Sequence, residues 1–165
     1  MSLTSRYHMH KQEAELTDPA AIEAVLRAGR FATLALCRDG EPYVVTMNYG
    51  FEPAHAGATL YFHCANAGLK LDIIRANPRA CGTVVEDRGY QMGKCSHSYR
   101  SVVFWGDVAV VEDTEAKRHA LEVMIGHLED DPDGVRRRVL ADPRRLAGVT
   151  ILRLTITGLT GKAGQ

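Results

Sequence analysis

The chain has 165 residues, 45% of them apolar and 24% charged, which is the composition of an ordinary globular domain. Because 20 Lys and Arg balance 20 Asp and Glu, the formal charge is zero, and a general nucleic-acid binder or a polybasic membrane-surface protein is disfavoured. No apolar run approaches a membrane span and no apolar signal segment opens the chain, so we expect a cytoplasmic protein with four free cysteine thiols and no membrane partner.

The first predicted element is a helix that follows an extended arm over residues 1–17. Asp18 is a good N-cap, Pro19 suits the first helical position, and Gly29 is a C-terminal stop signal. Periodicity and capping signals predict three further helices, which cover residues 69–76, 114–128 and 135–140.

Six strands are predicted from apolar alternation and turn signals, over residues 31–37, 42–49, 59–64, 81–86, 99–111 and 149–157. Asp39 and Gly40 form a tight hairpin turn, and residues 52–57 and 87–97 are predicted as loops. Because hairpins dominate and strands do not alternate regularly with helices, we expect a mainly β protein of the α+β type. The predicted architecture is one domain over residues 1–165, a small antiparallel barrel with peripheral helices.

A candidate anion site lies where residues 61–70 pass from a strand, through a glycine turn, into a helix. Helix N-termini carry unpaired N–H groups and a partial positive charge, which suit phosphate. Lys70 falls in that first turn, where a cation is unfavourable to the helix dipole unless an anion offsets it. The alternative is a solvated surface lysine. Motifs for common nucleotide and hydrolase sites (GxGxxG, the Walker loop, HExxH, GxSxG) do not occur in the sequence.

Three further segments combine polar groups with strand or glycine patterns. One strand carries polar or polarizable side chains that can face a flat heterocycle, namely Thr46, Met47, Asn48 and Tyr49. The alternative interpretation is an ordinary half-exposed strand without a ligand. Arg100 and Ser101 open an otherwise apolar strand. Glycines beside Lys162 allow close approach of the backbone to a ligand, with a fraying terminus as the alternative.

Metal and thiol chemistry have weaker support in the sequence. A zinc set can be assembled only without standard ligand spacing, from His8, His10, His63, Cys64, Cys95 and His97. His63 and Cys64 are adjacent, and neighbouring side chains on a strand point to opposite faces, so a Cys–His nucleophile pair is geometrically poor.

Taken together, these segments resemble the pyridoxamine 5′-phosphate oxidase-like FMN-binding split-barrel family, and within it the branch of nitroimidazole-resistance flavoproteins. The resemblance spans residues 18–162. Its pieces keep the family's order and are residues 31–35 with Asp39 and Gly40, 42–45, 60–63 with 68–70, 99–103 with Gly106, and 160–162.

The resemblance implies a six-stranded split β-barrel, a homodimer, and FMN bound in grooves at the subunit interface. Lys70 would hold the FMN phosphate beside the backbone of Gly68 and Leu69, and His63 would lie beside the flavin and position or protonate a small-molecule substrate. Ser101 and Arg100 would reach FMN from the same or the partner subunit. The residues implied at the cofactor are Thr46, Met47, Asn48, Tyr49, His63, Cys64, Gly68, Leu69, Lys70, Arg100, Ser101 and Lys162.

The chain departs from the pyridoxamine-phosphate oxidases themselves at three places. Residues 44–47 replace an Arg/Lys-rich strand, residues 68–70 replace Ser-Arg-Lys, and an arginine-bearing terminal segment is not found before Gln165, so vitamin B6 oxidation is disfavoured. The leading hypothesis is an FMN-dependent oxidoreductase, with nitroreductase activity as one form. The alternatives are a non-catalytic flavin-binding or storage protein and a haem- or metal-binding protein.

Overall fold

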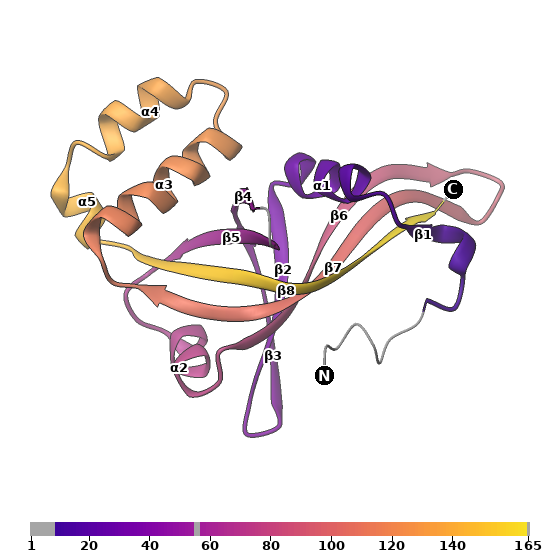
Figure 1. The fold of residues 1–165 in the computed structure, drawn as a ribbon, viewed down its shortest axis with the longest axis horizontal. Helices are drawn as coiled ribbons and strands as arrows, with labels where there is room; N and C mark the ends of the chain where they lie inside the picture. Colours follow the sequence, from indigo (N-terminus) through magenta and orange to yellow (C-terminus); the bar gives the residue numbers. More distant parts are fainter. Residues whose placement is uncertain (1–8, 55–56, 165) are drawn as a thin grey trace.

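One antiparallel sheet of eight strands organises the molecule (Figure 1). The computed structural model describes residues 9–54 and 57–164. The strands follow the order β3-β2-β6-β7-β8-β5-β4, and β1 pairs with β8. Their bounds are β1 Glu15–Leu16, β2 Phe31–Arg38, β3 Glu41–Asn48, β4 Gly50–Ala54, β5 Gly57–Cys64, β6 Arg79–Gln91, β7 Ser96–Val111 and β8 Thr150–Gly164.

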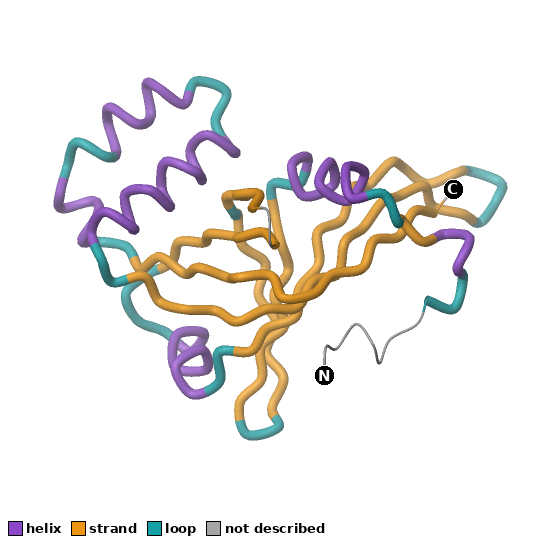
Figure 2. The backbone as a smooth tube through the Cα atoms, viewed as in Figure 1, coloured by secondary structure: helices purple, strands orange, loops and turns teal. Residues whose placement is uncertain are grey.

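The helices lie outside this sheet, as Figure 2 shows in purple. Helices α3, α4 and α5 gather in one group beside β4, β5 and the start of β8, whereas α1 and α2 lie apart from it (Figure 1). Their bounds are α1 Pro19–Ala28, α2 Leu69–Ala76, α3 Thr114–Leu128, α4 Pro132–Val139 and α5 Pro143–Ala147, with a 3₁₀ turn, η2, over Gln12–Ala14. Among the described residues, none of these helices is long and apolar enough to cross a bilayer.

Local sequence signals account for several element boundaries. Asp18 accepts a hydrogen bond from the backbone N–H of Ala20 at 3.0 Å and Pro19 opens α1, as predicted. Asp39 and Gly40 adopt φ angles of 54° and 85°, the left-handed values that a two-residue hairpin turn requires. Together with the antiparallel sheet and the helices outside it, these boundaries confirm the predicted mainly β architecture with peripheral helices.

The prediction of six strands is wrong, because the sheet has eight. Strand β1 belongs to the predicted arm and forms only through its pairing with β8, where Glu15 lies opposite Lys162. Strand β4 was predicted partly as a loop; the chain breaks its extended run at the buried Tyr49, and the following residues pair with β5. The ends of the strand order, β3 and β4, are not joined by a hydrogen-bonded pairing within the described ranges, although β3 packs against β5.

Longer strands and an added helix change the remaining boundaries. Strands β6 and β7 extend as a hairpin through most of the predicted loop over 87–97, and β8 runs to Gly164. The predicted helix over 135–140 is α4, which starts earlier, and α5 follows it.

Two apolar clusters hold these layers together. The main core lies inside the curved sheet and under α1 and α2, and it includes Leu34, Val84 and Phe104, which are fully buried. The second cluster packs α3 against Tyr61 and Ile151.

One strand face is left open to solvent. It belongs to β2, β3, β6 and β7 and points away from the main core. Cross-strand register aligns Thr33 with Thr46 on one side and Thr83 on the other. Phe31, Val44 and Val85 are 59%, 62% and 56% exposed. We call this surface the outer sheet face.

Candidate functional site

Helix α2 begins differently from the other α-helices of the described chain. Each of the other four starts at an aspartate whose carboxylate accepts a hydrogen bond from a first-turn backbone N–H, and these residues are Asp18, Asp113, Asp131 and Asp142. Helix α2 starts at Gly68, for which the described residues provide no side-chain cap. The Leu71 N–H donates to the Gly68 carbonyl at 2.9 Å, so the N–H groups of Leu69 and Lys70 are the ones available to an external anion.

The surroundings of Gly68 leave space for such an anion. Gly68 has a φ of 135°, which L side chains rarely adopt, and apart from Gly68 and its two chain neighbours no described residue has an atom within 4 Å of the position that a Cβ would take. Leu69 is 59% exposed and Lys70 half-buried in the same turn. An ammonium group, two backbone N–H groups and open space fit a phosphate group.

Cys64 lies at the end of β5, close to this helix start. Its side chain packs against the main core. Burial raises the pKa of the Cys64 thiol, and the nearby Lys70 ammonium offsets part of that rise. The structure therefore brings together Cys64, Gly68, Leu69 and Lys70 from the predicted set.

His63 lies on the other face of the same strand, as strand alternation predicts. It faces a pocket of about 390 Å³ between the end of β5 and the helical group. Burial lowers the pKa of the His63 imidazole, which favours the neutral form near pH 7. Neutral imidazole can donate at one nitrogen and accept at the other, so it can hold or transfer a proton.

The predicted ring-lining segment divides by strand alternation. Thr46 and Asn48 are exposed, and the Thr46 hydroxyl lies 2.9 Å from the Thr33 hydroxyl. Met47 packs against the main core. Tyr49 is fully buried, and its hydroxyl donates to the Leu26 carbonyl at 2.6 Å. Only Thr46 and Asn48 of this segment present side chains at the surface.

The remaining predicted residues lie on the ribbon formed by the far ends of β6, β7 and β8. Ser101 is opposite Lys162 in the β7–β8 register. Arg100 forms an ion pair with Glu86, at 2.6 Å between Nη2 and Oε2. Figure 1 shows α2 and the end of β8 far apart, so a single chain does not bring this group to α2.

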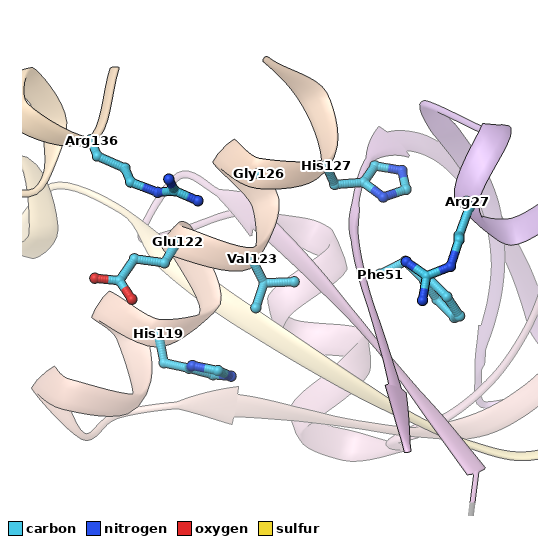
Figure 3. Close-up of a pocket in the computed structure, with 8 residues that line it drawn as sticks. All are labelled: Arg27, Phe51, His119, Glu122, Val123, Gly126, His127 and Arg136. Atoms are coloured by element: carbon cyan, nitrogen blue, oxygen red, sulfur yellow. The ribbon is translucent and has the colours of Figure 1, made fainter. Parts of the chain in front are cut away.

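A separate pocket of about 490 Å³ lies between α1, α3, α4 and β4 (Figure 3). His119 Nε2 lies 2.7 Å from Glu52 Oε1, and His127 Nε2 lies 2.7 Å from the Gly29 carbonyl oxygen. Arg27 stacks over the Phe51 ring at 5.3 Å. These contacts connect α3 to β4 and the end of α1, which is a structural role that sequence reasoning did not find.

The metal alternative concerns the predicted histidines and cysteines. His8 lies outside the described residues. Across the part of the chain that is described, no three His, Cys, Asp or Glu side chains gather in a group able to hold a metal ion. The four cysteines are free thiols.

A sequence profile of the family described as pyridoxamine 5′-phosphate oxidase matches residues 18–163, nearly the whole described chain. The chain belongs to the pyridoxamine 5′-phosphate oxidase family. Within the family, an uncharacterized protein of Rhizobium meliloti is 32% identical over 97 residues, a match that covers 59% of this chain and 57% of that relative. The chain thus covers little more than half of this relative's length.

Two solved structures resemble this family member along most of its length. One is a candidate 5-nitroimidazole antibiotic resistance protein from Bacteroides thetaiotaomicron, with 26% identity, a TM-score of 0.74 and coverage of 96% of both chains. The other is an FAD-binding protein from Mesorhizobium loti, with 27% identity, a TM-score of 0.63 and coverage of 92% of this chain and 97% of the other. Flavin binding is typical of the pyridoxamine 5′-phosphate oxidase family.

Proposed function

We propose that this protein binds FMN, with the phosphate group at the start of α2. The observation that carries the proposal is the glycine-initiated N-terminus of α2, with Lys70 in its first turn and open space beside Gly68. One ammonium and one helix N-terminus provide for one phosphate group, which favours FMN over a dinucleotide. Family membership and the FAD-binding relative support a flavin as the ligand.

A second copy of the chain would complete this site. Ser101 and Lys162 lie on the ribbon, away from α2, and the outer sheet face exposes large apolar side chains such as Phe31 and Val44. A two-fold interface is the commonest way to cover such a face, and it can carry residues of one copy to the other. We propose a homodimer with the flavin at its interface, which should sediment at twice the chain mass of 18.1 kDa.

The proposed activity is that of an FMN-dependent oxidoreductase. A bound flavin accepts and passes on electrons, and the protein supplies binding, orientation and proton control. Lys70 would hold the phosphate, Thr46 and Asn48 would face the ring, and neutral His63 would hold a proton for the substrate. The Bacteroides relative suggests a nitro compound as one acceptor class. Turnover of a nitroaromatic acceptor with a nicotinamide donor would separate an enzyme from a flavin carrier.

The phosphate assignment is tested by titrating wild type and Lys70→Ala with FMN and with riboflavin, which lacks the phosphate. Loss of a charge-assisted contact worth about 1.5–3 kcal/mol should weaken FMN binding by about one to two decades. Riboflavin should bind both proteins equally. Lys117→Ala is the control: Lys117 is half-buried on α3, as Lys70 is on α2, and this variant should bind FMN like wild type. Unchanged FMN affinity in Lys70→Ala would remove the assignment.

A further inference from the structure

The pocket beside His63 has the lining of a small-molecule site. It lies between the end of β5 and helices α3, α4 and α5, and measures about 390 Å³. Its walls are mainly aliphatic and hold two nitrogen-bearing side chains, one from the strand and one from α5. The lining residues are His63, Leu121, Val139, Arg145, Gly148 and Val149. An apolar pocket with a few convergent polar groups is the common form of a ligand site.

The charge in this pocket is limited to that of one guanidinium. Arg145 Nε lies 3.8 Å from Asp142 Oδ2, beyond hydrogen-bond distance, and both side chains are about half exposed. The pair is therefore weak and leaves the guanidinium donors available. Because burial favours neutral His63, the imidazole adds no charge near pH 7. A single, partly compensated cation suits a monoanion better than a phosphate dianion.

The pocket is connected to the start of α2 through Asn66. The Asn66 amide donates to the Ala147 carbonyl at the end of α5, at 3.1 Å, and its oxygen accepts from the Thr150 hydroxyl at 2.9 Å. The loop that leads to Gly68 is thus fixed to the segment that carries the pocket wall. His63 itself lies next to Cys64 at the end of β5, where the chain turns toward α2.

We infer that this pocket binds a small monocarboxylate with an apolar body, held by Arg145 through its carboxylate and by His63 through a hydrogen bond. The planar guanidinium fork matches a carboxylate in a bidentate manner, and the aliphatic walls accept the apolar part. The assignment of the pocket as the substrate subsite of the enzyme rests on the proposed flavin function. Carboxylate binding in the pocket depends only on the residues that line it.

Benzoate is a suitable probe, with benzamide as its uncharged counterpart, and binding is measured by calorimetry on the purified full chain. Benzoate affinity should fall at least tenfold in Arg145→Gln and remain at the wild-type value in Arg144→Gln, whose side chain is exposed on the same helix. Arg145→Lys should lie between the two because it keeps the charge and loses the fork. Benzamide should bind weakly and equally to all four proteins. Equal benzoate affinity in wild type and Arg145→Gln would overturn the inference.

FMN titration of the same variants separates this inference from the proposed function. Arg145→Gln should bind FMN like wild type, and benzoate should perturb the absorption spectrum of flavin bound to wild type but not to Arg145→Gln. If FMN fails to bind and benzoate affinity still depends on Arg145, the carboxylate site is supported and the flavin function is refuted. If FMN binds and benzoate leaves its spectrum unchanged in wild type, the subsite is refuted while the flavin function stands.

Discussion

Replacing Tyr49 with phenylalanine tests the division between core and site that the structure makes within the segment 46–49. Tyr49 is fully buried, with Phe62 and His127 as ring neighbours at 6.4 and 4.9 Å. Its hydroxyl donates to the Leu26 carbonyl in the last turn of α1, where carbonyls have no partner within the helix. Burial raises the pKa of Tyr49 well above its usual range, so the hydroxyl remains a donor.

The size of the effect follows from this one bond. Tyr49→Phe keeps the ring and its packing but leaves the Leu26 carbonyl buried without a donor. An unsatisfied buried acceptor costs about 1–3 kcal/mol. For a chain of this size each kcal/mol lowers the Tm by roughly 2–4 °C. Flavin affinity should not change, because the side chain faces the core.

The assay is urea unfolding followed by circular dichroism at a fixed protein concentration, with flavin titration in parallel. The midpoint should move to lower urea with an unchanged slope. Tyr43→Phe is the control, since Tyr43 is half-buried on β3, and it should stay within about 0.5 kcal/mol of wild type. Full stability of Tyr49→Phe combined with weaker flavin binding would refute the reasoning and assign the hydroxyl to the cofactor.

Three further outcomes test the packing and the titrating groups. In Gly82→Ala the new methyl would lie 2.5 Å from Phe104 Cζ, so unfolding free energy should fall by about 1–3 kcal/mol in the same urea assay. Burial and then the Glu52 carboxylate raise the pKa of Tyr61 to about 12. Ultraviolet titration should find the Tyr61 pKa at that value in wild type and at a lower value in Glu52→Gln. The stability that neutral Tyr61 adds should be lost between pH 10 and 12. Burial lowers the pKa of His63, so the stability that the neutral imidazole adds should be complete above pH 6.5 and should be lost as the pH falls below that value. An NMR titration of the His63 imidazole should have its midpoint below 6.5.

Features that depend on neighbouring residues in the chain were predictable from the sequence. The cap of α1 at Asp18, the hairpin turn at Asp39 and the start of α2 at Gly68 are set by residue types within one turn. Family membership was predictable for a related reason, because five short matching pieces keep their order along the chain.

Features that depend on distant partners were not predictable in this way. Strand β1 has two residues and exists only beside β8, and the Tyr49 hydroxyl finds its acceptor on another element. Arg145 was missed as a candidate because an arginine in a charged helical segment resembles a solvated one. It gains a role only when the fold places α5 beside the end of β5.

Strand β8 pairs with β7, β5 and β1, and so joins segments from both halves of the sequence. During translation it leaves the ribosome after all the strands that it joins. Until then β5 and β7 each present a long unpaired edge, and the two apolar clusters lack Leu154 and Ile151. We expect the nascent chain to remain open and dependent on chaperones until β8 emerges, and to acquire protease resistance in one late step.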